Sequence, residues 1–254
     1  MLWQVKDTNK YFLCSMHILP EADAALDRQI WDLVRRRPRI VFESDLSKGR
    51  FPAEATYQDG NRLQEFVPSD IYAKCARLWA ELELKDELSV CKPWWAAMQI
   101  GLAVAAQNGF LLNHGVEQQL LKQLSLIQPV YLEDPRAAIL PFIESPLSEQ
   151  AIMLAQCSKG EASIMKEFRF VHESWRHSDL SALSKYLDEK RAEAPKTYTA
   201  LIDERNEAWA PLINKFLHDS EPTLFVLGIL HFVGKNKIPD CLNNLNRVVL
   251  QQVC

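Results

Sequence analysis

Residues 222–234 read Pro-Thr-Leu-Phe-Val-Leu-Gly-Ile-Leu-His-Phe-Val-Gly, and this stretch decides the fold. Its first half is a continuous run of aliphatic and aromatic residues, which is typical of a strand buried on both faces. Gly228 then removes a side chain where the backbone bends or is closely approached. His231 follows just past the strand end. Because open α/β sheets bind ligands outside the carboxyl ends of their strands, His231 is a candidate functional residue.

A second stretch near the start of the chain has the same form. Residues 11–19 read Tyr-Phe-Leu-Cys-Ser-Met-His-Ile-Leu, and when Cys14 is aligned with Gly228, His17 aligns with His231. Two similar strand ends from opposite ends of the sequence predict two halves of one site, or a remnant of internal duplication. For either histidine alone, the competing interpretation is an imidazole that is only hydrogen-bonded inside a core or loop.

Strand and helix patterns alternate along the chain, which predicts an α/β fold with a mixed central β-sheet flanked by helices. The predicted strands are residues 2–5, 11–14, 39–43, 129–133, 223–228 and 247–252, of which the first two form a hairpin and the last two a strand pair. The predicted helices are residues 22–37, 115–126 and 238–245, with a long, broken helical region over residues 148–217.

Residues 47–113 differ from the rest of the chain. Loop-like segments are followed by helical stretches at residues 69–82 and 93–108, so we expect a helical insertion within a single domain that spans residues 1–254. The tryptophans of this insertion are Trp79, Trp94 and Trp95. Aromatic residues at helical spacing most often pack in a core, and the lining of a substrate groove or lid is the alternative.

The composition excludes several classes of protein. The 254 residues are 48% hydrophobic and 24% charged with a net charge of -4, which is ordinary for a globular protein and offers no basic surface for nucleic acid. Six scattered cysteines without a Cys-x-x-Cys pair fit a reduced compartment better than a disulfide framework. No apolar segment is long enough to span a bilayer, and the first predicted strand begins at once without an export signal. We therefore expect a cytoplasmic protein without a membrane span.

Together these features resemble the TraB/GumN family, which includes the Tiki proteins. That family has two Gly-x-x-His motifs, one early and one late, and here they are residues 14–17 and 228–231. The early motif is followed by Leu-Pro or similar, as at residues 19–20. The resemblance spans nearly the whole chain, with one departure: Cys14 stands where the family usually has glycine.

Three further features of the sequence are similar to the family. An acidic residue ends the strand after the first motif, here Glu43, and a Gly-Leu-Glu often ends a later strand, where this chain has Tyr-Leu and then Glu133. An Arg-Asn pair lies on a helix before the last motif, here Arg205 and Asn206.

The resemblance implies that the histidines and carboxylates at the strand ends converge. His17 and His231 would supply two neutral imidazole nitrogens to a divalent metal ion such as Mn, Co or Zn. Glu43 would complete the ligand set, leaving open positions for water and substrate, or would act as a base.

The remaining residues would act on the substrate. Glu133 would be a general base or a partner that orients the ligands. Arg205 would stabilise an oxyanion or grip a substrate carboxylate, and Asn206 would orient the same group. From the residues alone, the favoured interpretation is that the two glutamates are solvated loop carboxylates and that Arg205 belongs to a surface ion pair on a helix.

The resemblance to Tiki-type metalloproteases implies a metal-dependent hydrolase, most simply a metallopeptidase, that acts on a peptide or another small acyl substrate. A non-catalytic binding or regulatory protein that keeps the fold is the alternative, and the replacement of glycine by Cys14 favours it.

Two other patterns carry less weight. His172 and His177 flank a zincin-like sequence, but histidines five residues apart lie about 140° apart around a helix and do not share a metal. Cys14 beside His17 suggests a cysteine nucleophile, but if the strand continues, residues three apart point to opposite faces of the sheet.

Overall fold

The strands of the protein form a six-stranded mixed sheet and a smaller, two-stranded one. The computed structural model describes residues 1–23, 26–36, 38–45, 53–124, 128–246 and 249–253. In spatial order the strands are β6 (Val130–Tyr131), β4 (Arg39–Phe42), β7 (Thr223–Gly228), β2 (Lys10–Ser15), β1 (Leu2–Val5) and β8 (Leu250–Gln252). A separate two-stranded sheet contains β3 (Leu19–Pro20) and β5 (Phe110–Leu111). The predicted mixed α/β fold is confirmed.

The four strands β6, β4, β7 and β2 run parallel, so their carboxyl ends lie at one edge of the sheet. β1 pairs antiparallel with β2, which confirms the predicted hairpin. The predicted pairing of residues 223–228 with the last strand is wrong. β7 lies between β2 and β4, whereas β8 pairs with β1 at the far edge. Strand β7 is central because its apolar side chains are buried on both faces.

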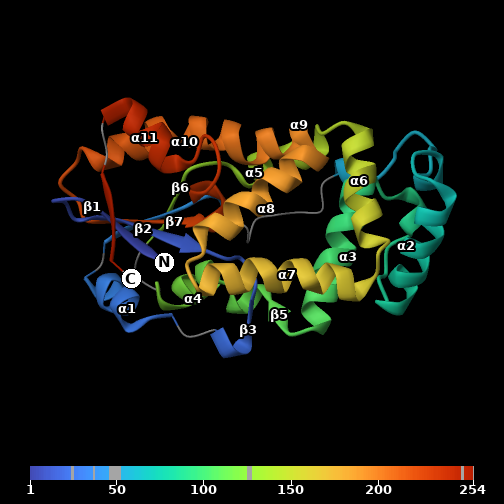
Figure 1. Ribbon diagram of the computed structural model, residues 1–254, viewed down its shortest axis with the longest axis horizontal. Helices are drawn as coiled ribbons and strands as arrows, with labels where there is room; N and C mark the ends of the chain where they lie inside the picture. Colours follow the sequence, from blue (N-terminus) through green and yellow to red (C-terminus); the bar gives the residue numbers. More distant parts are fainter. Residues whose placement is uncertain (24–25, 37, 46–52, 125–127, 247–248, 254) are drawn as a thin grey trace.

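The helices cover both faces of the sheet (Figure 1). They are α1 (Arg28–Arg35), α2 (Ser69–Glu81), α3 (Pro93–Gln107), α4 (Val116–Gln123), α5 (Pro135–Ile143), α6 (Leu147–Cys157), α7 (Glu161–Arg176), α8 (Leu180–Glu193), α9 (Pro195–Tyr198), α10 (Arg205–Leu217) and α11 (Ile238–Asn246). A π-helix, η7 (Thr199–Glu204), joins α9 to α10. Helices α1 and α4 lie on one side of the sheet and α10 and α11 on the other, and all four contribute to its core.

Local capping explains where two helices differ from prediction. Helix α1 begins at Arg28 rather than at Ala22, because the side chain of Asp27 accepts a hydrogen bond from the first-turn N–H of Gln29. Residues 24–25 and 37 of the predicted helix lie outside the described residues. Helix α5 was not predicted. It begins at Pro135, after the capping side chain of Asp134, and it contains a second proline that argues against a helix in sequence.

The helical stretches around residues 69–81 and 93–107 build a second hydrophobic core with α6 and α7. They lie at the opposite end of the molecule from the sheet (Figure 1). Trp79 is buried in this core and Trp95 packs against it, as the core interpretation predicted, whereas Trp94 is fully buried and stacks on Phe142 of α5. Trp79 donates a hydrogen bond to the carbonyl of Asp86 at 2.9 Å. Residues 46–52, at the start of the predicted insertion, lie outside the described residues.

No helix within the described ranges combines the length and the apolar character that crossing a membrane requires.

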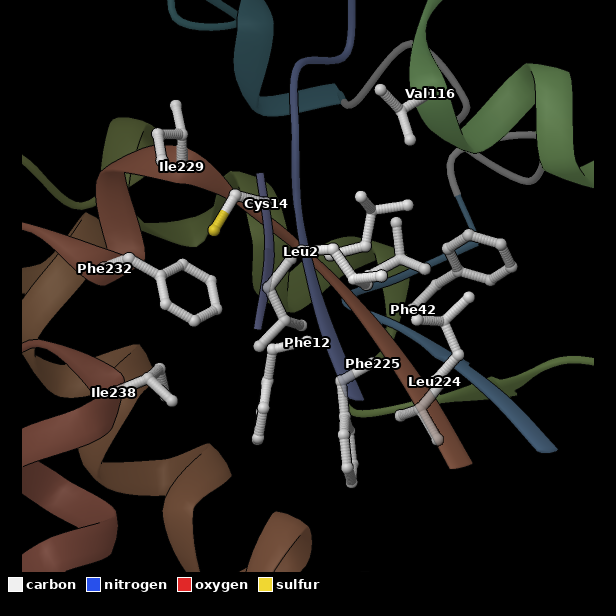
Figure 2. Packing of buried hydrophobic residues seen from close by; sticks show 14 of the residues in the cluster. Leu2, Phe12, Cys14, Phe42, Val116, Leu224, Phe225, Ile229, Phe232 and Ile238 are labelled. Carbon is white, nitrogen blue, oxygen red and sulfur yellow. The ribbon is translucent and has the colours of Figure 1, made fainter. Parts of the chain in front are cut away.

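The centre of the sheet core is a stack of two phenylalanines (Figure 2). The rings of Phe12 and Phe225 lie 4.6 Å apart at 16°, and both side chains are fully buried. We predict that Phe225→Ala lowers the free energy of unfolding by about 3–5 kcal/mol, because it leaves a cavity in the centre of the core. Urea denaturation measures this change. The matched control is Phe170→Ala, at a side chain that is 43% exposed, which should change stability by less than about 0.5 kcal/mol. Equal effects of the two substitutions would contradict the packing described.

Candidate functional site

Four side chains predicted from sequence stand at the shared carboxyl edge of the parallel strands. Glu43 follows β4 directly, and Glu133 follows β6 after one intervening residue. His17 and His231 lie just beyond the ends of β2 and β7. Because these strands are parallel neighbours, the chain must place the four residues at one edge of the sheet.

Arg205, the first residue of α10, joins the two carboxylates. Its Nη2 donates to Glu43 Oε2 at 2.9 Å and to Glu133 Oε1 at 2.7 Å. The guanidinium lies over the ring of Trp209 at 4.5 Å, and Trp209 Nε1 donates to Glu133 Oε2 at 3.0 Å. The side chains of Arg205, Glu43 and Glu133 are about nine-tenths buried. The surface interpretations of the arginine and the glutamates are therefore wrong.

The hydrogen bonds of Asn206 fix the tautomer of His231. Asn206 Nδ2 donates to the carbonyl of Asn236 at 2.8 Å, so Asn206 Oδ1 faces His231 Nδ1 at 2.7 Å and can only accept. The proton of His231 therefore sits on Nδ1, and Nε2 carries a lone pair. His231 Nε2 lies 3.7 Å from Glu43 Oε1 and 3.4 Å from Arg205 Nη1. Burial lowers the pKa of His231 to about 3, so the ring is neutral at ordinary pH.

Glu117, on the first turn of α4, holds His17. Glu117 Oε1 lies 3.0 Å from His17 Nδ1 and accepts a hydrogen bond from Ser15 Oγ at 2.5 Å. The charge of Glu117 raises the pKa of the half-exposed His17 to about 9. Gly115 permits this contact, because a Cβ there would come within 2.0 Å of the His17 carbonyl oxygen. Glu117 is not among the site residues predicted from sequence, although it lies on the apolar stripe of its helix, where a carboxylate is out of place.

Gly228 leaves a space that the predicted residues share. A Cβ at this position would lie 3.1 Å from Glu43 Oε1, 3.6 Å from His231 Cδ2 and 3.8 Å from His17 Nε2. The N–H of Gly228 also donates to Glu43 Oε1 at 2.6 Å. The two imidazoles and the carboxylate therefore converge on one point beside a residue without a side chain.

Positive neighbours keep Glu43 ionised. Burial alone would raise the pKa of this carboxyl group, but the cations around it and the N–H of Gly228 outweigh burial and lower the pKa to about 2. Arg205 is the permanent charge among them, and its own pKa is raised against the effect of burial because Glu43 and Glu133 stabilise the guanidinium. The buried carboxylates are thus neutralised in part by one arginine.

The register of the two strands differs by one residue from the sequence alignment of the two Gly-x-x-His-like motifs. In the β2–β7 ladder, Ser15 rather than Cys14 lies beside Gly228. The Cys14 side chain instead enters the core near Ile229 and Phe232 (Figure 2). Burial raises the pKa of its thiol to about 12, which excludes a thiolate nucleophile at neutral pH. The residue that departs from the family pattern therefore lies beneath the site and not in it.

The zincin-like sequence forms no site. His172 is buried and its Nε2 lies 2.7 Å from Asp23 Oδ2, which ties α7 to the short 3-10 turn at Glu21–Asp23. His177 is exposed at the end of the same helix. Both rings approach Glu173, His172 Nδ1 at 3.7 Å and His177 Nε2 at 3.4 Å, but one ring is buried and the other exposed, and no metal-holding group of side chains is found within the described residues.

The model of the TraB/PrgY/gumN family matches residues 1–249 of the 254. The chain belongs to the TraB/PrgY/gumN family. No curated protein and no solved structure matches it. Membership in the TraB/PrgY/gumN family confirms the resemblance drawn from the motifs, and the geometry above is what this family member offers at its strand ends.

The residues of this TraB/PrgY/gumN protein fit the expected divalent ion in the chemistry of their donor atoms. Both imidazoles hold an oxygen acceptor at Nδ1, which is the usual arrangement of histidine ligands. His17 Nε2 faces the space beside Gly228, and so does His231 Cδ2, the ring carbon next to Nε2. Within the described ranges, no group of three or more His, Cys, Asp or Glu side chains is already arranged to hold a metal. Arg205 accounts for this, because it engages Glu43 and approaches His231 Nε2.

The pKa of His17 tests the role of Glu117. We predict a value of about 9 in the wild type and, in Glu117→Gln, a fall toward the ordinary 6.5, because the substitution removes the carboxylate that stabilises the imidazolium. Since the folded pKa is the higher one, charged His17 stabilises the fold below pH 6.5, and this contribution is lost as pH rises through about 9. NMR titration of the imidazole measures the pKa. Glu173→Gln, beside the exposed His177, is the control and should leave His17 unchanged. A wild-type value near 6.5 would contradict the contact.

Proposed function

We propose that the protein is a metal-dependent hydrolase that acts on a peptide or another acyl substrate at the carboxyl edge of β2, β4, β6 and β7. One observation carries the proposal: His17 and His231, from distant parts of the chain, each have an oxygen acceptor at Nδ1, and His17 Nε2 and His231 Cδ2 both lie within 3.8 Å of the position that a Cβ on Gly228 would take. An oxygen acceptor at Nδ1 places the lone pair of a neutral imidazole on Nε2, the nitrogen that would bind an ion, and in His231 that nitrogen lies 3.4 Å from Arg205 Nη1.

In this proposal His17 and His231 hold the ion, and Glu43 contributes its carboxylate. When bound, a divalent ion polarises a carbonyl group and lowers the pKa of a coordinated water to about 7. Glu43 suits a ligand better than a base, since its low pKa makes it a weak proton acceptor. Asn206 Oδ1 holds the proton of His231 on Nδ1, and the carboxylate of Glu117 likewise holds a proton on Nδ1 of His17.

Arg205 is the group that meets the substrate. Its guanidinium is buried and fixed by Glu133 and Trp209, and its Nη1 lies 3.4 Å from His231 Nε2. A preorganised donor of this kind stabilises the negative charge that develops on a carbonyl oxygen during hydrolysis. Both oxygens of Glu133 are already hydrogen-bonded, so Glu133 positions Arg205 rather than accepting a proton.

A binding or regulatory protein without catalysis is the second candidate. It is favoured by the ion pairs of Arg205, because they compensate the buried charges of Glu43 and Glu133 without any metal. The two candidates make opposite predictions about metal binding.

Metal titration separates the two candidates. Calorimetric titration with Mn²⁺, Co²⁺ and Zn²⁺ should give a stoichiometry of about one for the wild type, and His17→Ala and His231→Ala should each weaken binding by about 10–100-fold. His177→Ala is the matched control, because it removes an exposed imidazole far from the strand ends. Equal binding by all four proteins, or no binding by any folded protein, would overturn the metallohydrolase and leave the binding protein.

Arg205→Lys tests the assignment of the oxyanion donor. Lysine keeps the charge but cannot reach both carboxylates and the shared space at once, so we predict that kcat falls by about 10²–10³-fold while metal affinity stays within a few fold. The measurement is hydrolysis of fluorogenic peptide and ester substrates with the ion that the titration selects. An unchanged kcat in a folded variant would remove Arg205 from the catalytic machinery.

A further inference from the structure

A cavity of about 690 Å³ reaches the site from the side of α5 and the π-helix. Glu133 and Arg205 lie in its wall, so the buried ion pair of the site is also part of the cavity lining. Its size is within the range of pockets that bind drug-sized molecules. The cavity therefore gives the site a binding space beyond the strand ends.

Two helical walls form the cavity, and small or apolar side chains line much of both. Ala137 and Leu140 come from α5, whereas Thr199 and Ala200 come from the π-helix. π-Helices are rare and occur frequently at functional sites. This one ends at Arg205, so the same backbone irregularity shapes the cavity and places the guanidinium.

The charges at the rim favour a cation. Glu144 and Glu204 line the cavity and are exposed, and neither carboxylate forms a hydrogen bond or ion pair with another described residue. The lining holds two cations, Arg205 and Lys196, of which Arg205 is already paired with the carboxylates of Glu43 and Glu133. Arg136, whose charge reaches Glu144, is itself paired with Glu54. Among the charges of the lining that are not already paired, the two carboxylates of Glu144 and Glu204 outnumber the one amine of Lys196.

We infer that this cavity is the specificity subsite of the proposed hydrolase, and that it takes an extended peptide segment in which small apolar side chains adjoin a lysine or arginine. The inference rests on the proposed function, because it assumes that the scissile bond of the peptide lies beside Arg205 at the end of the cavity. The apolar walls bind the uncharged part of the segment, and Glu144 and Glu204 bind its cationic side chain.

The experiment measures binding in a protein that does not hydrolyse. The His17→Ala, His231→Ala double variant is titrated, by fluorescence anisotropy, with a fluorescein-labelled peptide of Ala, Leu and Lys and with the same peptide carrying Glu in place of Lys. We expect the lysine peptide to bind about fivefold more tightly, since each exposed charge pair contributes up to about 1 kcal/mol.

Bulky substitutions on opposite walls locate the binding space. Ala137→Trp and Thr199→Trp, each added to the double variant, should weaken the lysine peptide by about tenfold or more, because the indole occupies the cavity. Ala73→Trp, on the exposed face of α2, is the matched control and should have no effect. Both walls are substituted so that, if one variant fails to fold, the other still tests the inference. Thermal unfolding shows whether each variant is folded.

Charge substitutions test the rim. Glu144→Gln with Glu204→Gln should abolish the preference for lysine over glutamate and leave the apolar contribution in place. Unchanged peptide affinity in the folded wall variants, or no binding of the lysine peptide at all, would overturn the inference. The proposed function is tested separately, by metal titration and hydrolysis. If the protein proves to be a metal-dependent hydrolase but the wall variants bind the peptide as before, only the subsite inference is wrong.

Discussion

The ion pairs of Arg205 with Glu43 and Glu133 are the interactions on which the rest of the site depends. Two carboxylates in a nearly water-free environment would be strongly unfavourable without a cation that satisfies both. Arg205 provides it in a fixed fork, stacked on Trp209. Because the carboxylates follow adjacent parallel strands and the arginine begins a helix across the sheet, one guanidinium ties three elements together.

That bridge also explains the arrangement around it. With Glu43 held by Arg205 and by the N–H of Gly228, the wall of the shared space is fixed, and His231 can be neutral beside it. The π-helix before Arg205 aims the guanidinium at the strand ends and opens the adjoining cavity. The π-helix therefore both positions Arg205 and lines the cavity, as expected because π-helices occur frequently at functional sites.

Sequence predicted those parts of the site that follow from sheet geometry. Apolar runs that end in His17, Glu43, Glu133 and His231 had to meet if the strands were parallel neighbours, and they do. The position of Glu117 in the apolar stripe of α4 was a signal in the sequence, but its contact with His17 was not predictable, because that depends on how α4 packs beside the end of β2. The partner of β8 was missed for a related reason: pairing at a sheet edge is set by tertiary packing and not by the local pattern.

The most direct test of the shared-space account is the nitrogen NMR spectrum of the two imidazoles, recorded with and without one equivalent of Zn²⁺. The account predicts a neutral Nδ1–H tautomer for His231 between pH 4 and pH 9, since its pKa lies near 3. It also predicts that the Nε2 resonances of His17 and His231 shift together on addition of the ion. An Nε2–H tautomer of His231, or a shift of only one ring, would show that the two nitrogens do not face a common site.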